Sequence, residues 1–575
     1  MNSCCSKLPA LLGLLLVAAC TETSPPLDSA NTLCQSEFTS LPSIQGSAYQ
    51  SSLKDSALSV RGVVTFVSRG KGFYLEDPDT LTDATASKAL FISDETLSTQ
   101  VQPGQSLAIS GRVDELGSAR DTLTSLVDIT GHEICGADIA LPLSRVALPL
   151  DSAGREALEG MRVSFDQELT LTDVYKLSEG EATFSSNGVL RVPTEVQLPG
   201  EAAQAVEKKN RAHSVVATLP TRNSPAPVGS TVPALTGVMG HDGRNPRLLL
   251  DSTPDFTTPS LAAAPERSAG TVRIVNSNLL NFFNGDGQGG GFPTERGARS
   301  HEQFLDQSAR IREVMASLQP DLLAVQELEN DGFGPLSAAR SLLALLNETG
   351  NEDWAYIEPG TEKIGSDVIT VGLFYRTQVL ESVGPARVLD SPEFKGLSRQ
   401  PLAQLFRHIS SGVTFLAAAN HLKSKGRCPD SGSNADQGDG QYCWNQARTS
   451  AVSAELPWLE DLASNSGTDR IIVLGDMNAW RLEDPIRRFV ESGYIELVEK
   501  LSGLPQHSFL YWGQIGTLDY AFATPAMAEY ARSAVIWHIN ADWPREMKQP
   551  HPWLRASDHD PVIVDFDFSQ SATLD

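Results

Sequence analysis

Several apolar runs in the C-terminal half of the chain lead into, or begin just after, side chains that can hold a metal ion or move a proton. These side chains are Asn278, Glu327, His421, Asp476, Asn478, Asp519, Asp558 and His559. Carboxylate oxygens suit Mg²⁺ and Mn²⁺, and histidine is the side chain whose charge changes near neutral pH. The set is typical of metal-assisted acid–base chemistry on an anionic substrate, and no competing nucleophile motif accompanies it.

The stretch RIIVLGDMNAW, residues 470–480, shows this pattern in its shortest form. Apolar residues lead into Gly475, and Asp476 and Asn478 then stand two positions apart. In an extended chain such residues project to the same side, so we expect this strand end to present an acceptor for water and a donor for phosphate. Gly-Asp-x-Asn is also a favourable turn, and a turn alone explains the glycine.

Strand-like and helix-like stretches alternate between residues 271 and 569, and these elements must position the polar groups. The runs TVRIV, LLAV, VGLFY, VTFLAAA and RIIVL are short and continuously apolar, as strands are when both faces are buried. Residues 302–318 carry an apolar helical face, and Asp484-Pro485 supplies a helix N-cap followed by proline. The pattern predicts a layered α/β domain in which strand ends on one rim can converge on one cleft.

The chain upstream of that domain is rich in short β-like runs. Residues 34–139 contain LSVRGVVTFV, KGFYLED, KALFIS and QSLAISGRV, separated by turn residues, which predicts a small barrel. Phe66, Phe73 and Tyr74 are either stacking platforms for bases or, as we expect in so small a barrel, core residues.

Residues 140–260 are predicted to form a second β-rich domain, and 261–270 a linker to the α/β domain. No constellation of metal-binding or acid–base residues stands out between 140 and 260. The whole chain has 575 residues, of which 41% are hydrophobic, so it can bury the cores of several domains.

The chain is acidic overall, with a formal charge of -26 and a pI of about 4.8. This charge argues against a protein that coats nucleic acid through global electrostatics, although a local basic groove is compatible with it. One stretch, residues 391–427, departs from the average, because six basic residues accompany only one acid, Glu393. It is either a patch that contacts substrate phosphates or an ordinary solvated surface. The basic residues are Lys395, Arg399, Arg407, Lys423, Lys425 and Arg427.

The N-terminus has the features of an export signal. Lys7 precedes an apolar run from Leu8 to Ala19 that is too short to span a bilayer, which predicts a signal peptide over residues 1–19. Small residues directly before Cys20 resemble the cleavage site of bacterial lipoproteins, whose cysteine is lipidated; an ordinary secretory signal is the alternative. We therefore expect an exported protein, anchored at the cell surface or outer membrane by lipid, or secreted.

The residues that follow, 20–33, are polar with two prolines and are predicted to be a flexible tether. Four cysteines remain once the signal peptide and Cys20 are set aside. In an oxidising compartment we expect them to form two disulfides, Cys34–Cys135 and Cys428–Cys443.

The polar strand ends, in this order, resemble the endonuclease/exonuclease/phosphatase superfamily, which includes deoxyribonuclease I. The motifs that carry the resemblance are Asn278, Gln326-Glu327, Asn420-His421, Gly475-Asp476-Met477-Asn478, Leu518-Asp519-Tyr520 and Ser557-Asp558-His559-Asp560-Pro561. The resemblance implies that residues 271–569 form a four-layered α/β sandwich with catalytic activity.

Within the superfamily the chain is most similar to large bacterial extracellular nucleases, through HLKSKGRC, DQGDGQYCWNQAR and LSRQPLAQLF. Those nucleases also carry β-rich domains upstream, so the resemblance implies that residues 34–139 are an OB-fold-like accessory domain. Residues 218–230 lack the acidic stretch expected there from this resemblance.

The resemblance also implies a role for each strand-end residue. Glu327 is the expected ligand of Mg²⁺ or Mn²⁺, with Asn278 and Asp558 near the same ion. His559 is the expected base, and Asp519 orients it. His421 either donates a hydrogen bond to the phosphate or acts as the acid.

Other residues are expected to assist. Asp476 activates or orients the water, and Asn478 hydrogen-bonds the phosphate. Arg399 and Lys423 are the expected phosphate contacts. Asp367 either supports His421 or is a solvated residue before a strand. A structural Ca²⁺ in the loop from Arg427 to Cys443 is a further candidate.

The favoured function is an exported, metal-dependent nuclease that acts on DNA and also on RNA. The alternative is an exported phosphoesterase of the same fold that acts on a phospholipid, as sphingomyelinases do, or on a phosphorylated small molecule. An adhesive lipoprotein without activity is disfavoured because the chemical residues are all intact. The sequence predicts no protein partner.

Overall fold

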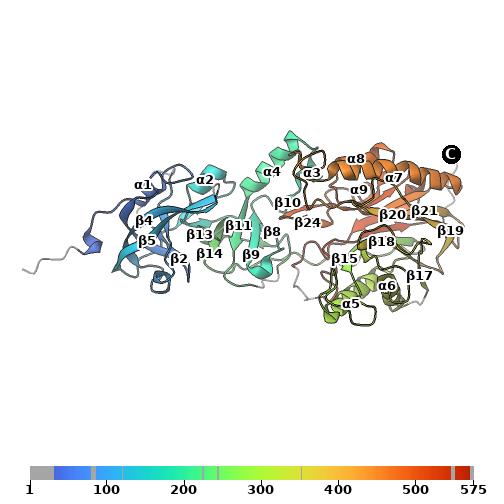
Figure 1. Ribbon diagram of the computed structural model, residues 1–575, viewed down its shortest axis with the longest axis horizontal. Helices are drawn as coiled ribbons and strands as arrows, with labels where there is room; N and C mark the ends of the chain where they lie inside the picture. The colour runs from blue at the N-terminus through green and yellow to red at the C-terminus, as the bar shows by residue number, and fades with distance from the viewer. Residues whose placement is uncertain are drawn as a thin grey trace, which may run out of the picture.

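Figure 1 shows the computed structural model of the protein as an elongated chain with a barrel at one end, an eight-stranded sheet in the middle and an α/β sandwich at the other end. The structure describes residues 32–78, 86–118, 121–222, 226–242, 245–350, 353–544 and 551–569. The predicted signal peptide, Cys20 and most of the tether lie outside these ranges. Within them, no helix combines the length and the apolar character that crossing a membrane requires.

Five strands close the N-terminal barrel in the order β1-β2-β3-β5-β4, which confirms the predicted small barrel. Their bounds are β1 (Ala57–Ser68), β2 (Gly72–Glu76), β3 (Ala89–Ile92), β4 (Ser106–Ser118) and β5 (Asp121–Gly136). Phe73 and Tyr74 are buried, and the hydroxyl of Tyr74 accepts a hydrogen bond from the backbone N–H of His241 in the middle sheet (3.0 Å). These two aromatics are core residues; the likeness of the barrel to an OB-fold domain of nucleases stays a prediction.

Both predicted disulfides are present. Cys34–Cys135 ties the segment before the barrel to β5. Cys428–Cys443 closes the polar loop that leads into helix α7 (Asn445–Asn465).

The middle region is built on an eight-stranded sheet of order β12-β8-β9-β11-β14-β13-β7-β6. The strands are β6 (Ser144–Val146), β7 (Arg162–Phe165), β8 (Leu169–Asp173), β9 (Glu181–Ser185), β11 (Ser214–Thr218), β12 (Thr231–Val232), β13 (Leu235–His241) and β14 (Pro246–Leu250). Helix α4 (Glu201–His213) accompanies them, with the short helices α2 (Ser152–Glu156) and α3 (Pro193–Val196). The region is therefore β-rich, as predicted, but it also contributes a helix of thirteen residues.

One short strand of the middle region, β10 (Leu190–Arg191), does not belong to the eight-stranded sheet. β10 pairs in parallel with β25 (Gln514–Gly516), which in turn pairs with β24 (Phe509–Tyr511) of the C-terminal domain. The small sheet β10-β25-β24 therefore joins two regions that the sequence presents as separate domains.

Buried contacts reinforce this junction. Val192, directly after β10, packs in one cluster with Trp480 of the C-terminal domain. The carboxylate of Glu195 accepts hydrogen bonds from the backbone N–H groups of Thr517 (3.1 Å) and Arg481 (3.3 Å). The middle region and the α/β domain are thus held together by sheet pairing, apolar packing and buried hydrogen bonds.

Two six-stranded sheets form the C-terminal sandwich. The first has the order β17-β18-β16-β15-β28-β27, and the second β19-β20-β21-β22-β26-β23. The strands of the first sheet are β15 (Val272–Phe282), β16 (Leu322–Glu329), β17 (Trp354–Tyr356), β18 (Ile369–Arg376), β27 (Ala531–Ile536) and β28 (Val562–Phe566). Those of the second are β19 (Leu380–Val388), β20 (Arg399–His408), β21 (Thr414–His421), β22 (Ile471–Asp476), β23 (Ile495–Glu496) and β26 (Asp519–Ala523).

Helices cover the outer face of each sheet, which makes four layers and confirms the predicted fold class. Apolar residues of both sheets form one core between them. Helices α5 (His301–Leu318) and α6 (Ala338–Asn347) pack on the first sheet, and α7 with α8 (Asp484–Glu491) on the second. The short helices α9 (Leu497–Ser502) and α10 (Pro525–Ala528) complete the domain.

The predicted helix starts are close to those observed. α5 begins at His301, one residue before the predicted start, and Ser300 caps it by accepting from the backbone N–H of Gln303. α8 begins at Asp484, but its N-cap is Glu483, so the predicted cap lies one residue too late. Such shifts of one residue are within the ordinary fraying of helix ends.

Candidate active site

A row of four polar residues crosses the second sheet at one rim. Arg399 at the start of β20 faces His421 at the end of β21, His421 faces Asp476 at the end of β22, and Asp476 faces Asp519 at the start of β26. The row forms because β21 and β22 are parallel to each other whereas β20 and β26 run in the opposite direction. The convergence predicted from separate strand ends is therefore confirmed for this sheet.

The first sheet brings its residues to the rim in the same way. Asn278 in β15 is the register partner of Gln326 in the parallel strand β16, next to Glu327. β28 runs antiparallel to β15, so the loop before it, with Asp558 and His559, lies at the same end. The side chain of Asn278 reaches the second sheet, because its Nδ2 donates to Asp476 Oδ2 (3.2 Å).

The carboxylate of Asp476 is the centre of the site. Its Oδ2 lies 3.3 Å from His421 Nε2 and 3.9 Å from His559 Nε2, in addition to the contact with Asn278. Its Oδ1 accepts a hydrogen bond from the backbone N–H of Asn478 (2.9 Å). Burial would raise the pKa of Asp476, but the two imidazoles outweigh burial and hold this pKa well below its ordinary value.

The imidazole of His559 is held between two carboxylates. Its Nδ1 is 2.8 Å from Asp519 Oδ2, which also accepts a hydrogen bond from the hydroxyl of Ser508 (2.7 Å). Phe509 packs on the other side of the ring, with centroids 4.5 Å apart. Burial would lower the pKa of His559, but Asp519 and Asp476 raise it well above its ordinary value.

The pKa of His421 is lowered, whereas that of His559 is raised. His421 is fully buried, and burial followed by the charge of Arg399 lowers its pKa to about 4. The ring is therefore neutral at neutral pH, when it can donate a hydrogen bond through Nε2 but has no proton to release as an acid. Of the two roles expected for His421, the hydrogen-bond donor is the one that the environment favours.

Glu327 lies in an irregular part of β16. The register with β18 shifts between Val325 and Leu328, and Glu327 has a φ of 59°, in the left-handed region that costs an ordinary residue about 1–3 kcal/mol. Leu280 and Asn281, within a matching irregularity of β15, also have positive φ. The backbone N–H of Asn281 donates to Glu327 Oε2 (2.9 Å), so the two irregular segments hold the carboxylate in place.

The charges around Glu327 fit a divalent cation. Burial and the neighbouring carboxylates of Asp558 and Asp476 raise the pKa of Glu327 to about 7, although His559 partly opposes them. Buried carboxylates that repel one another are stabilised by a bound cation, and oxygen ligands suit Mg²⁺ or Mn²⁺. Glu327, Asn278 and Asp558 are therefore the residues that would hold such an ion.

Arg399 and Asp367 lie beside this centre. Arg399 is buried, donates through Nη2 to the carbonyl of Leu422 (3.2 Å), and has an Nε without a hydrogen-bond partner among the described residues. Asp367 Oδ2 is 4.0 Å from Arg399 Nη1, and its Oδ1 is 3.7 Å from Arg296 Nη2. Asp367 therefore lies beside Arg399 and Arg296. The alternative in which it supports His421 has no such contact behind it among the described residues.

The basic residues of 391–427 do not form one patch in the described part of the chain, and several of them pair with carboxylates. Lys425 is buried and pairs with Glu483 Oε2 (2.5 Å). Arg407, near the far end of β20 from Arg399, pairs with Glu381 of β19. Lys395 pairs with Asp390. These partners come from segments outside the run, so counting charges along the chain did not reveal them.

Lys423 is partly buried and near the site. Its Nζ lies 5.0 Å from the centre of the Trp444 ring and donates to the carbonyl of Ser424 (2.9 Å). Burial, and then Arg399, lowers its pKa to about 8, so the ammonium form still predominates at neutral pH. Arg399 and Lys423 thus remain the candidate phosphate contacts of the run.

Asn478 does not follow the extended path expected from RIIVLGDMNAW. β22 ends at Asp476, and Asn478 has a φ of 48°, so the chain has already turned. Its Nδ2 donates to the carbonyl of Leu422 (3.2 Å), the same oxygen that Arg399 contacts. Asp476 and Asn478 are close because a tight turn folds one back on the other, and alternation along a strand is the wrong explanation.

The sequence-based prediction missed an exposed aromatic residue in the hairpin that carries Phe509. Trp512, at the turn between β24 and β25, is 82% exposed. It follows Phe509, which packs on His559, by three residues, or about 10 Å of extended chain. The exposure of a single tryptophan has no signal in the sequence, because YWG also reads as a buried strand end.

The chain was compared with family models, curated proteins and solved structures. Residues 278–559 match the sequence model described as the Endonuclease/Exonuclease/phosphatase family. A search of curated proteins found no match.

Solved structures similar to the chain include the human Nocturnin catalytic domain with bound sulfate, at 18% identity, with 52% of this chain and 93% of that chain covered and a TM-score of 0.35. An endonuclease/exonuclease/phosphatase from Bacteroides vulgatus is 15% identical, with 51% and 98% covered and a TM-score of 0.35. A mannosyl-6-phosphatase from Bacteroides thetaiotaomicron is 16% identical, with 51% and 98% covered and a TM-score of 0.35.

Proposed function

We propose that this protein is a divalent-metal-dependent nuclease that cleaves phosphodiester bonds of DNA and also of RNA, because residues 278–559 match the model of the Endonuclease/Exonuclease/phosphatase family, whose members hydrolyse phosphate esters. The observation that carries the proposal is the contact of Asp476 with Asn278, His421 and His559 at the rim where both sheets end. Such an arrangement places a carboxylate and two imidazoles of very different basicity around one point.

A divalent cation held by Glu327, with Asn278 and Asp558 nearby, would neutralise charge on the phosphoryl oxygens. The side chains of the chain itself divide the other tasks. Asp476 orients the attacking water. The deprotonated form of His559, which the positive charge of a bound cation would favour, accepts the proton of that water, and Asp519 stabilises the imidazolium that forms. Neutral His421 and Asn478 donate hydrogen bonds to the phosphate.

Trp512 favours a nucleic acid over a small phosphate ester that has no aromatic ring. An exposed indole ring can stack on a base, and such stacking contributes about 1–3 kcal/mol per base. The choline of a sphingomyelin headgroup would instead meet the face of the ring as a cation, so direct assay must separate these two substrates. The buried Arg399 and the partly buried Lys423 are the groups that would meet the phosphate.

The test is an assay on circular and linear DNA, on RNA and on sphingomyelin vesicles, each with Mg²⁺, with Mn²⁺ and with EDTA. We expect cleavage of nucleic acid that EDTA abolishes and either metal restores. His559→Ala should lower kcat by about 10²–10⁴-fold, whereas His132→Ala, exposed in the barrel, should leave it unchanged. Hydrolysis of sphingomyelin without cleavage of nucleic acid would establish the alternative phosphoesterase instead.

We further propose that the protein is exported and anchored through a lipid on Cys20. The N-terminal sequence and the two disulfides support this location, since disulfides persist in oxidising compartments. Mass spectrometry of the mature chain should find a diacylglycerol-modified residue 20. A mature chain that begins at another residue would show ordinary secretion.

A further inference from the structure

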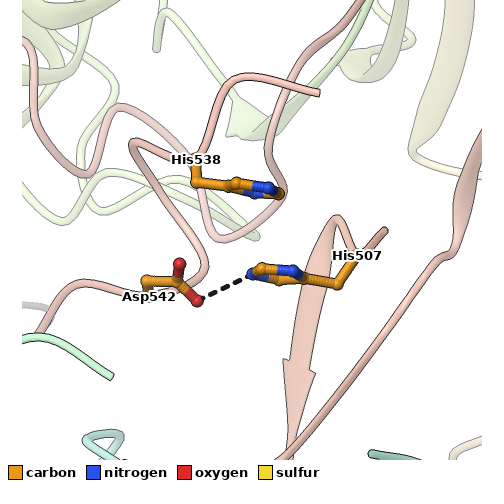
Figure 2. Close-up of side chains that lie close together, drawn as sticks. All are labelled: His507, His538 and Asp542. Atoms are coloured by element: carbon orange, nitrogen blue, oxygen red, sulfur yellow. Dashed lines mark hydrogen bonds and ion pairs between the residues drawn. The ribbon is translucent and has the colours of Figure 1, made fainter. Parts of the chain in front are cut away.

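Two histidines and an aspartate meet outside the candidate active site. His507 precedes β24, and His538 and Asp542 lie in the loop after β27. Each offers one ligand atom, and the three atoms lie within 4.8 Å of one another. Figure 2 shows the two imidazole rings face to face, with the Asp542 carboxylate at the edge of the His507 ring.

The geometry of the cluster is compact. His507 Nε2 is 2.9 Å from Asp542 Oδ1, and the two rings are nearly parallel, at 5°, with centroids 4.0 Å apart. Two protonated imidazoles at this distance would repel each other. An imidazole binds a metal in its own plane, so one of the two stacked rings must turn about its Cβ–Cγ bond before both hold the same ion. A metal ion bound by both rings would keep them neutral and still use the Asp542 carboxylate.

A second carboxylate supports His538. Asp560 Oδ2 lies 3.2 Å from His538 Nδ1, and Asp560 Oδ1 accepts hydrogen bonds from the backbone N–H groups of Ile539, Asn540 and Ala541. A carboxylate that fixes the orientation of a histidine from behind is a regular feature of metal centres in proteins.

Two arginines lie near the cluster. The charges of Arg191 and Arg555 reach it, but their guanidinium groups donate to the backbone carbonyls of Gln506 and Asn540. Both carbonyls belong to the loops that carry the three candidate ligands, so these arginines brace the loops.

We propose that His507, His538 and Asp542 bind a Zn²⁺-type transition-metal ion, at a site distinct from the catalytic cation. Two imidazole nitrogens and one carboxylate oxygen suit Zn²⁺, whereas Mg²⁺ and Ca²⁺ prefer oxygen ligands. Three protein ligands leave the fourth tetrahedral position for water.

A bound ion would link the Asp519–His559 pair to the junction between the middle region and the C-terminal domain. Ser508, next to His507, donates to Asp519 Oδ2 (2.7 Å), and its carbonyl accepts from the backbone N–H of Asp560 (2.8 Å). The carbonyl of Asp542 accepts from the backbone N–H of Val228 in the middle region (2.8 Å). A single ion would therefore fix the loop beside Asp519, the loop before His559 and the middle region relative to one another.

The experiment measures metal content, which does not depend on catalysis. The full chain and its Glu327→Gln/Asp558→Asn variant, which lacks carboxylates of the catalytic site, are loaded with Zn²⁺ and then passed through gel filtration in excess Mg²⁺. We expect about one Zn²⁺ per chain in both proteins. His507→Gln and Asp542→Asn should each lower the retained Zn²⁺ at least tenfold, whereas His551→Gln, an exposed histidine outside the cluster, should retain it.

Co²⁺ provides a second measurement on the unaltered cluster. Bound Co²⁺ should give visible absorption bands of a site with nitrogen ligands, and Zn²⁺ should remove them whereas Mg²⁺ should not. If the Glu327→Gln/Asp558→Asn protein retains no Zn²⁺ and shows no Co²⁺ bands, the proposal is wrong and the cluster is a hydrogen-bond network only. This measurement also decides the matter if His507→Gln fails to fold.

Discussion

The charge of Asp476 helps to set the pKa of His559. Its carboxylate contacts Asn278, His421 and His559, and it is one of the groups that raise the pKa of His559. His421, equally near, remains neutral because burial and Arg399 outweigh the same carboxylate. Two histidines around one aspartate thus differ in protonation, which is what separate donor and proton-transfer roles require.

Replacing Asp519 tests the role of His559. Asp519→Asn removes the charge next to Nδ1 and so lowers the pKa of His559. We expect kcat to fall by about 10²-fold or more and the acidic limb of its pH profile to move to lower pH, because a base with a lower pKa loses its proton earlier. Steady-state rates between pH 5 and pH 9 provide the measurement. Movement of the alkaline limb instead would show that His559 acts as the acid.

Replacing Trp512 tests the substrate class. Trp512→Ala should weaken binding of an oligonucleotide by about fivefold to 150-fold, because base stacking contributes about 1–3 kcal/mol. Hydrolysis of bis(p-nitrophenyl) phosphate, which has no base, should be unchanged. Tyr49→Ala, an exposed aromatic of the barrel region, is the matched control. Equal losses on both substrates would mean that Trp512 supports the fold of its hairpin and does not bind bases.

At the scale of elements, helix α7 contributes a buried glutamate, Glu455, that contacts the end of β21. Glu455 in α7 accepts a hydrogen bond from Asn420 Nδ2 (2.9 Å), the residue before His421. Burial raises the pKa of Glu455 to about 8. The folded protein therefore keeps this proton up to about pH 8, whereas the unfolded chain loses it near the ordinary value of 4.5.

Glu455 makes the folded protein less stable as the pH rises. The contribution of Glu455 to stability is fully present below about pH 4.5 and is lost as the pH rises toward 8. Glu455→Gln keeps an acceptor for Asn420 and has no proton to lose, so it should raise stability at pH 8 by roughly a few kcal/mol relative to wild type. Urea unfolding at pH 5 and pH 8, with exposed Glu460→Gln as control, measures the effect. An equal gain at both pH values would contradict this origin.

The sequence predicts elements well where one local pattern decides the structure. Continuous apolar runs identified the central strands, and their polar ends identified Glu327, His421, Asp476 and Asp519, because strand direction brings those ends to one rim. The turn at Asn478 was not predictable in this way, because its φ of 48° depends on the backbone beyond β22.

Partners far apart in sequence account for most of the other differences. Lys425 reads as a surface charge, yet Glu483 and the rings of Tyr442 and Trp480 enclose it. The His507 cluster combines loops from both sides of β26, and no spacing rule for metal ligands covers such a separation. Tertiary contacts of this kind are set by packing, which composition and periodicity do not report.

At the scale of the whole molecule, the junction limits how the chain can be divided. β10 extends the small sheet that carries Phe509, and Phe509 packs on His559. Glu195 is buried against Thr517 and Arg481, and this burial raises its pKa to about 7. A fragment that began at the predicted linker would therefore expose Trp480 and lose one edge of the sheet beside the active site.

The two disulfides should have separable effects. Replacing Cys34 and Cys135 with serine opens a loop with a sequence separation of 101 residues and should destabilise the barrel by about 2–5 kcal/mol, with kcat unchanged. Replacing Cys428 and Cys443 should raise KM for nucleic acid, because that loop leads to Trp444, which packs on Lys423. Thermal unfolding and steady-state kinetics of both variants provide the comparison. A large loss of kcat in the first variant would show that the barrel takes part in catalysis.

The pairing of β15 with β28 has a consequence for biosynthesis. These are the first and last strands of the sandwich, yet they lie side by side within the first sheet. The ribosome makes β15 early and β28 late, so that sheet stays open until nearly the whole domain has been synthesised. Asp558 and His559 directly precede β28. A nascent chain therefore already contains Glu327 and Asp476 but no assembled centre, and hydrolytic activity arises only when translation is nearly complete.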